Sequence, residues 1–316
     1  MTEVTSSHAT KAFRFGIKVR NAATGKAWRE LARKVEDLGY STLFLADHFD
    51  EAWSPMVPLT VAAESTTTLN VGALVFDNDY RHPLVLARDI AALDLISEGR
   101  VEFGFGAGWK ATDYEQSGIG FDRAAVRIDR MEEAVEIIQQ LWTAGTANFN
   151  GNHYTVHEAL CRPVPFTKGG PKILIGGGGK RVLTVAAKHA SIVGVNVELT
   201  SGSIGGDEAK SAVADRYHQR IGWIRDAAGD RFGDIELQIQ CQFEQITADR
   251  DALYEAMGPM FGISAEEARD VPIVLAGTVE QIVDDIVRRR TEFGLSYVVV
   301  HDLDGFAPVV AALAGT

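Results

Sequence analysis

Short apolar runs alternate along the chain with stretches whose apolar residues recur at helical spacing. Residues 26–40 show the helical pattern clearly, because Trp28, Val35 and Leu38 share one face and Gly39 follows as a stop. Further helices are predicted at 58–67, 83–99, 123–142, 209–227 and 278–294, with one more after Gly179. Strands are predicted at 13–19, 41–47, 69–76, 100–108, 191–197, 235–240 and 295–302, and one runs from residue 171 into Gly176.

The predicted strands are continuous apolar runs rather than alternating ones, which indicates strands buried on both faces and paired in parallel. Eight strand–helix units in succession predict an α/β fold, a (β/α)8 TIM barrel formed by residues 13–316 as one domain. A doubly wound sheet is the alternative. Residues 1–12 are expected to form a flexible tail, and 147–159 a small hairpin at an Asn-Gly pair. The segment 243–276 has no clear pattern.

The composition suits a domain with a large core, since 46% of the residues are hydrophobic and 23% are charged. The formal net charge of -12 argues against nucleic acid and anionic membrane surfaces as partners. No apolar run reaches the roughly 18 residues of a transmembrane helix, and residues 1–12 lack the apolar centre of a secretory signal. Cys161 and Cys241 stand outside any metal-binding pattern, so we expect free thiols, no metal site and a cytoplasmic location.

Polar residues follow the predicted strands at their C-terminal ends, where a barrel carries its chemistry. Asp47 and His48 end one strand, and a carboxylate–imidazole pair can position a proton or hydrogen-bond a heterocycle. A structural cap with a satisfied histidine is the alternative. Trp53 is either a stacking wall or part of the core, and 77–79 is a polar loop that an ordinary turn also explains.

Glycines mark the end of the fourth predicted strand. Gly104, Gly106 and Gly108 resemble a dinucleotide fingerprint, but Trp109 stands where the third glycine belongs and no helix starts there. A Rossmann-type NAD site is therefore not expected. We interpret these glycines as backbone that lies close against a flat ligand, with Trp109 and Tyr114 lining the pocket.

Four consecutive glycines, Gly176 to Gly179, join the next strand to a helix. Their exposed amide N–H groups and the helix dipole together favour an anion, so we interpret this segment as a phosphate cradle. Lys180 and Arg181 add positive charge, and Asn196, after the following strand, can donate to the same phosphate. A tight turn that only closes the barrel is the alternative.

Taken together, these segments resemble the luciferase-like flavin and deazaflavin superfamily and, within it, the coenzyme F420-dependent oxidoreductases. The resemblance is carried by LARKVEDLGYSTLFLADHF, ALVFDNDYRHPLVLARDIAALDLISEGRVEFGFGAGW, DRAAVRIDRMEEAVEIIQQLW and PKILIGGGGKRVLTVAAKHASIVGVN. It covers about residues 13–300. It implies a barrel with insertions at its C-terminal rim, a cofactor at the strand ends, and a homodimer formed through helices near residues 58–96.

The resemblance also implies roles for individual residues. Asp47 and His48 match positions beside the reactive part of the deazaflavin, and Ala73 and Leu74 match the place of a non-prolyl cis peptide that backs the ring. The other cofactor contacts that it implies are Gly106, Ala107, Gly108, Gly177, Gly178, Gly179 and Asn196. The family's sugar-phosphate dehydrogenases carry a carboxylate where this chain has Trp109, so that substrate class is not expected.

Three functions remain open. The first is an F420-dependent oxidoreductase that transfers a hydride between deazaflavin C5 and a small organic substrate, with reduction of an activated C=C or C=N bond as the expected direction. His48 is then the first acid–base candidate, and Asp47 holds the cofactor or the imidazole. The second is an FMN-dependent monooxygenase with a separate flavin reductase, and the third is a non-catalytic flavin-binding protein. The loop at 199–208 is either a mobile lid or a surface linker.

Overall fold

The computed structural model describes residues 11–50, 53–198 and 211–316. Most of the predicted N-terminal tail and the whole 199–208 loop therefore lie outside the described residues. Within the described ranges, no helix is both long and apolar enough to cross a membrane.

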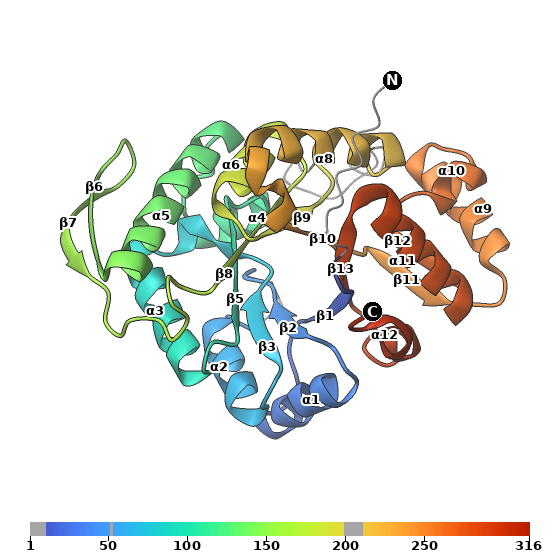
Figure 1. Ribbon diagram of the computed structural model, residues 1–316, viewed down its shortest axis with the longest axis horizontal. Coiled ribbons are helices and arrows are strands. Elements are labelled where there is room, and N and C mark those ends of the chain that lie inside the picture. The colour runs from blue at the N-terminus through green and yellow to red at the C-terminus, as the bar shows by residue number, and fades with distance from the viewer. Residues whose placement is uncertain (1–10, 51–52, 199–210) are drawn as a thin grey trace.

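A closed parallel barrel forms the centre of the molecule (Figure 1). Its strands are β1 Arg14–Val19, β2 Thr42–Leu45, β3 Asn70–Ala73, β4 Phe76–Asp77, β5 Val101–Gly106, β8 Lys172–Gly177, β9 Ile192–Val195, β10 Glu236–Gln240 and β13 Leu295–Val300. They pair in the order β1–β2–β3–β5–β8–β9–β10–β13, and β13 pairs with β1 to close the ring. β4 extends the β3 edge beside β5. The predicted (β/α)8 TIM barrel is thereby confirmed, and the doubly wound alternative is wrong.

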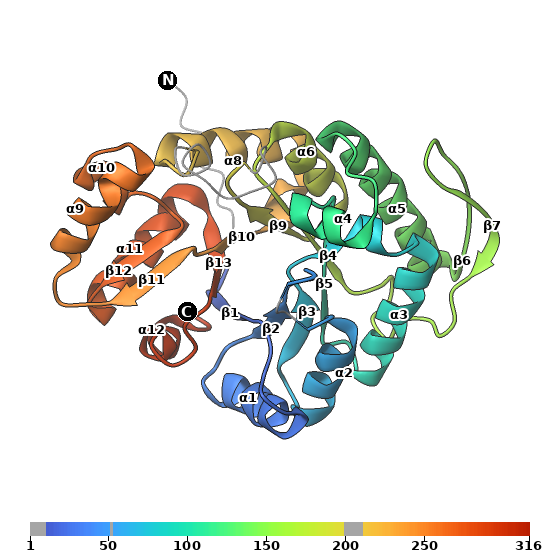
Figure 2. The same ribbon diagram turned by 180° about the vertical axis from the view of Figure 1, so that it is seen from behind.

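Helices surround the barrel as a ring (Figures 1 and 2). They are α1 Gly25–Asp37, α2 Met56–Ser65, α3 Pro83–Ile96, α4 Ala111–Ser117, α5 Ala124–Ala144, α6 Lys180–His189, α8 Ala214–Ala228, α9 Arg250–Phe261, α10 Ala265–Arg269, α11 Val279–Phe293 and α12 Ala307–Leu313, with 3-10 turns η1 Asn78–Tyr80 and η2 Gly229–Asp234. The predicted helices are confirmed, with ends that shift by a few residues. Local capping explains several boundaries: Thr278 and Gln281 form a capping box on α11, and Gly294 ends it with φ 76°.

Two insertions interrupt the strand–helix alternation. The predicted hairpin is present as β6 Thr146–Asn150 and β7 Thr155–Leu160, an antiparallel pair that projects outside the helix ring near α5 (Figure 1). The stretch without a clear pattern forms two short parallel strands, β11 Phe243–Ile246 and β12 Val274–Gly277, with α9 and α10 between them. These four-residue strands are too short for periodicity to reveal.

Inward-facing side chains fill the barrel in layers. At the N-terminal end Arg14 pairs with Glu102 and Glu236, at 2.5 and 2.7 Å. Above them, a separate apolar cluster contains Phe44, Leu74, Leu174, Ile192, Tyr297 and Val299. Burying each large apolar side chain stabilises the fold by about 1.5–3 kcal/mol. The C-terminal end of the barrel, above this apolar cluster, is called the mouth. The predicted site residues gather there.

Candidate functional site

His48 lies at the mouth in a fixed orientation. It follows β2, and its Nδ1 lies 2.6 Å from Oδ2 of Asp113 on α4, the helix beside the strand ends in Figure 2. Asp113 is buried and also accepts hydrogen bonds from the Phe49 amide and the Tyr80 hydroxyl. A carboxylate anchored in this way keeps the proton on Nδ1 of His48, which leaves Nε2 as an acceptor. The sequence pattern did not point to Asp113, because it belongs to a short helix 65 residues further along the chain.

The surroundings of His48 favour the neutral imidazole. Burial lowers the pKa of His48 below its ordinary 6.5, and the hydrogen bond to Asp113 opposes this effect. Trp109 packs edge-on against the imidazole, with ring centroids 5.6 Å apart. The side chain is still 20% exposed, so a substrate at the mouth can reach it. Neutral His48 can therefore accept a proton at Nε2 near pH 7.

Asp47 pairs with Arg81 rather than with His48. Arg81 donates to both carboxylate oxygens, at 2.5 and 3.0 Å, and the Asp77 amide donates to Oδ2 at 3.2 Å. Such a two-pronged ion pair fixes a carboxylate firmly. The prediction that Asp47 could hold the imidazole is therefore wrong, since Asp113 does so. Asp47 instead holds the backbone of β4 in place by accepting a hydrogen bond from the amide of Asp77, the last residue of that strand.

Asp77 is a buried carboxyl at the end of β4, and it begins the polar loop 77–79. It caps η1 by accepting from the Asp79 amide at 2.9 Å, so the turn interpretation of this loop holds. The Tyr114 hydroxyl lies 3.3 Å from Asp77 and donates to Asp79 at 2.9 Å. Burial raises the pKa of Asp77 to about 7. Tyr114 is only 2% exposed, so it stands behind the wall of the mouth rather than on its surface.

Gly104 and Gly106 of β5 are required by the packing of the protein itself. A Cβ on Gly104 would lie 1.9 Å from the Ala73 carbonyl oxygen, and one on Gly106 would lie 2.5 Å from a Val75 methyl group. Both glycines thus let β5 pack closely against the neighbouring edge. That their backbone also lies against a flat ligand stays a prediction. The non-prolyl cis peptide joins Leu74 and Val75, one bond later than expected. Ala73 is fully buried, and Leu74 faces the barrel interior.

The loop after β5 is held from outside the mouth. Arg127 of α5 is buried and donates to the carbonyl oxygens of Ala107 and Gly108, at 3.2 and 3.3 Å. Gly108 has a φ of 73°, and a Cβ there would meet the Tyr114 hydroxyl at 1.9 Å. Arg127 and Tyr114 therefore hold this backbone in place. Ala107 and Gly108 remain partly accessible at the mouth.

The four consecutive glycines that join the end of β8 to α6 differ from one another in what they contact. A Cβ on Gly177 would lie 2.2 Å from a Val182 methyl group, and one on Gly178 would lie 2.3 Å from the Val197 carbonyl oxygen. Gly179 is different, because no atom of the residues that the structure describes lies within 4 Å of a Cβ there, and its φ of -88° suits any residue. Gly177 and Gly178 thus shape the turn, while Gly179 borders open space.

The open space over Gly179 suits an anion. Gly179 is the N-cap of α6 and offers no side-chain acceptor, so the first amides of the helix are available to a ligand. Asn196 directly follows β9, the neighbouring strand, and its backbone N–H donates to the Gly177 carbonyl at 2.9 Å. Arg220 of α8 is buried and donates to the Gly178 carbonyl at 3.1 Å, which braces the loop from behind.

The two cations after the glycines behave differently. Arg181 forms an ion pair with Asp129 of α5, so its charge is already compensated. Lys180 is exposed and makes no ion pair within the part of the chain that the structure describes. Of the two, Lys180 is the cation available to an anionic ligand at Gly179.

Trp53 belongs to the wall between the barrel and its helices. Its ring packs against Trp28 of α1, with centroids 5.5 Å apart, and joins the main core cluster. The core interpretation of Trp53 therefore describes its contacts better than the stacking interpretation.

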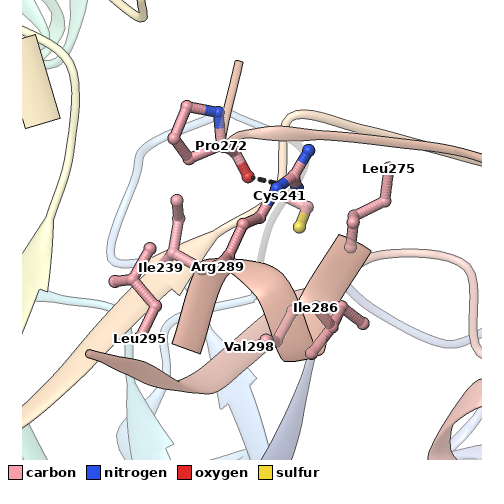
Figure 3. Close-up of a pocket in the computed structure, with 8 residues that line it drawn as sticks. All are labelled: Ile239, Cys241, Pro272, Leu275, Ile286, Arg289, Leu295 and Val298. Atoms are coloured by element: carbon pink, nitrogen blue, oxygen red, sulfur yellow. Dashed lines mark hydrogen bonds between the residues drawn. The ribbon is translucent and has the colours of Figure 1, made fainter. Parts of the chain in front are cut away.

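Two cavities lie away from the mouth. The one in Figure 3 lies between β10, β13 and α11, is apolar and has a volume of about 10 Å³. Its Arg289 donates to the Pro272 carbonyl at 2.9 Å. That volume holds one water at most. The other, of about 420 Å³, is lined by residues 169–173 and His189 before and at the start of β8, at the opposite end of the barrel. Neither cavity is a candidate for the reaction site.

Among the described residues, one group has the chemistry of a metal site. Glu132 and Glu136 of α5 and His189 of α6 place ligand atoms within 4.8 Å of one another. Lys188 already pairs with Glu132 at 3.0 Å, and Oε1 of Gln139 accepts a hydrogen bond from Nδ1 of His189 at 3.1 Å. These contacts join α5 to α6 far from the mouth, so they contribute to the helix ring rather than to the candidate site.

Comparison with known proteins identifies the family. The profile of the luciferase-like monooxygenase family matches residues 7–221. An F420-dependent glucose-6-phosphate dehydrogenase from Amycolatopsis mediterranei is 26% identical over 279 residues, which cover 81% of this chain and 76% of that protein. A 5,10-methylenetetrahydromethanopterin reductase from Archaeoglobus fulgidus is 32% identical over 161 residues, covering 51% and 46%.

The fold is also that of solved structures. The coenzyme F420-dependent tetrahydromethanopterin reductase of Methanopyrus kandleri superposes with a TM-score of 0.75 at 20% identity, covering 96% of this chain and 98% of that one. An identity this low supports the fold alone, whereas the family profile covers more than half of the sequence. The resemblance inferred from the sequence motifs is confirmed, and the chain belongs to the luciferase-like monooxygenase family.

Proposed function

We propose that the chain is an F420-dependent oxidoreductase that transfers a hydride between the deazaflavin and a small organic substrate. The observation that carries the proposal is the pairing of an oriented, neutral His48 with an open anion site at Gly179 on one barrel mouth. The F420-dependent glucose-6-phosphate dehydrogenase named above, a relative in sequence, supports the choice of cofactor.

The residues at the mouth suit F420. The amides at the start of α6 would hold its phosphate, with Gly179 leaving room and Lys180 and Asn196 nearby. The backbone at Leu74 and Ala107 would lie beside the ring. When bound, F420 supplies or accepts the hydride at C5.

His48 is the group that moves the proton. When the substrate is oxidised, Nε2 takes a proton from it, and Asp113 stabilises the resulting imidazolium at Nδ1. When an activated C=C or C=N bond is reduced, which is the direction we expect, the same Nε2 returns the proton. Trp109 covers one edge of the imidazole and limits access of water to it.

The test compares His48→Ala with His157→Ala, a matched change at an exposed histidine on β7. Substrates are screened as a panel of activated alkenes, imines and secondary alcohols, and turnover is followed by F420 absorbance. His48→Ala should lose about 10²–10⁴ in rate while F420 still binds, and His157→Ala should change neither. Equal turnover by both variants contradicts the role of His48 and favours a non-catalytic flavin-binding protein.

The family description favours a second candidate, an FMN-dependent monooxygenase working with a separate flavin reductase. The anion site at Gly179 would hold an FMN phosphate by the same contacts. Glucose 6-phosphate is not proposed as the substrate, because Trp109 stands where sugar-phosphate dehydrogenases of the family carry a carboxylate.

A homodimer through α2 and α3 remains part of the proposal. Both helices leave large apolar side chains exposed on the ring: Val57 at 73%, Val85 at 51%, and Leu95 and Ile96 at 46% each. Several exposed apolar side chains on two neighbouring helices are consistent with a protein interface. Light scattering that finds a monomer contradicts the dimer. The cytoplasmic location stays a prediction.

A further inference from the structure

Lys18 is a further charged group of the mouth. Its position follows from the way side chains alternate between the two faces of β1. Arg14 points into the barrel, and a Cβ on Gly16 would contact Phe44 and Val299 of the interior. Because successive side chains of a strand alternate between faces, Lys18 shares this inward face one layer higher. Its long stem therefore carries the ammonium group toward the mouth, on the His48 side.

The Lys18 ammonium has no partner. Within the part of the chain that the structure describes, it makes no hydrogen bond or ion pair. Asp50 is the carboxylate that raises the pKa of Lys18, and it lies 3.8 Å from Arg20 and 2.9 Å from Lys110. Lys18 also contributes to lowering the pKa of His48, which places the two groups within electrostatic reach of each other.

The environment of Lys18 explains its chemistry. The pKa of Lys18 is lowered to about 8, mainly by burial and in part by the positive charges of Arg20 and Lys110, while Asp50 opposes them. The amine is still mostly protonated at pH 7. A partly desolvated cation that shares the Asp50 charge with Arg20 and Lys110 is unfavourable unless a ligand supplies a further negative charge. His301, which follows β13, does not supply it, since it contacts Gln240 at 3.2 Å and lies 3.6 Å from Glu244.

A second unsatisfied polar group lies deeper in the same interior. Gln238 of β10 is 1% exposed, and neither polar atom of its side-chain amide has a hydrogen-bond partner among the described residues. Its Oε1 lies 2.7 Å from where a Cβ on Gly194 would stand, so the side chain points across the barrel rather than into the helix ring. The interior beneath the mouth thus offers a cation and a free amide, which is an environment for a polar ligand rather than for a hydrocarbon.

We propose that Lys18 binds a carboxylate of the substrate beside His48. The proposal rests on the proposed function and narrows its substrate to small organic acids whose reacting carbon lies near the carboxylate. One lysine matches the single charge of a carboxylate, whereas the amides at the start of α6 already provide the site suited to phosphate. In a conjugated acid, the bound ammonium also favours the electron density that moves onto oxygen when a hydride adds to the alkene carbon.

The test uses crotonate and crotonamide, which share their shape and differ in charge. Calorimetry on the F420-loaded protein should find crotonate bound about tenfold or more tighter than crotonamide. Lys18→Met should remove this preference and leave crotonamide binding unchanged, while Lys18→Arg retains it. Lys172→Met, at an exposed lysine on the opposite end of the barrel, is the matched control. A preference that survives in Lys18→Met, equal affinities in the wild type, or no binding of crotonate overturns the proposal.

A second readout does not depend on binding heats or on activity. Trinitrobenzenesulfonate, applied near the pKa of Lys18, should label that amine, and crotonate but not crotonamide should protect it, as located by mass spectrometry. Labelling that crotonate does not reduce overturns the proposal. F420 binding is measured in the same samples, so a wild type that binds no F420 refutes the proposed function, whereas normal F420 binding with no crotonate preference refutes only the assignment of Lys18.

Discussion

Gly179→Val tests the phosphate cradle without disturbing the fold. A Cβ at this position meets no atom of residues 11–50, 53–198 or 211–316 within 4 Å, and the backbone there is extended, with φ -88° and ψ 152°. Because valine is a poorer helix N-cap than glycine, the substitution should lower the free energy of unfolding by about 1 kcal/mol or less. The valine would instead occupy the space in which the α6 amides meet an anion. Losing the hydrogen bonds of a charged group costs about 1.5–3 kcal/mol, which weakens binding by about 10- to 150-fold.

The assay combines quenching of F420 fluorescence, which gives the dissociation constant, with thermal unfolding. Gly178→Val is the matched control, because its Cβ would lie 2.3 Å from the Val197 carbonyl oxygen. Overpacking of this kind destabilises by about 1–3 kcal/mol, so the control should lose thermal stability. Wild-type F420 affinity in a folded Gly179→Val protein refutes the cradle, and unfolding of that variant refutes the claim that the space is open.

Further predictions concern the groups around His48. Asp113→Asn removes the charge that keeps the proton on Nδ1 of His48, so turnover should fall by about 10²–10⁴ with F420 affinity unchanged; normal turnover argues against this role. Because imidazolium donates and neutral imidazole accepts, the rate of reduction should fall, and the rate of oxidation rise, as pH increases through the lowered pKa of His48. Profiles that keep this transition in His48→Ala contradict the assignment. Arg81→Met leaves buried Asp47 without its counter-charge and should destabilise the fold by about 3 kcal/mol in denaturant titrations; a loss below about 1 kcal/mol contradicts the pairing.

The barrel could be predicted from the sequence because its signals are local. Each buried strand is a continuous apolar run, and each long helix has its own periodicity and stop. The insertion after β10 could not be predicted, because β11 and β12 are short and pair only through tertiary contact across α9 and α10. Its pattern is set by what the strands touch and not by their own spacing.

The site was predictable only in part for the same reason. Strand ends pointed to His48, but its partner is decided by how α4 folds over the mouth, and that brings Asp113 rather than Asp47 to the imidazole. The glycines look alike in the sequence, yet Gly106 is explained by Val75 and Gly179 by open space. No sequence motif marks Lys18, because its lack of an ion pair depends on tertiary contacts that place Arg20 and Lys110 against Asp50.

The measurement that tests the central claim most directly is a paired titration of the wild-type protein with F420 and with FMN, each followed by fluorescence quenching. We predict tight binding of F420 that weakens in Gly179→Val, and much weaker binding of FMN. Tight binding of FMN together with no binding of F420 would contradict the account and make the chain a flavin-dependent monooxygenase candidate instead.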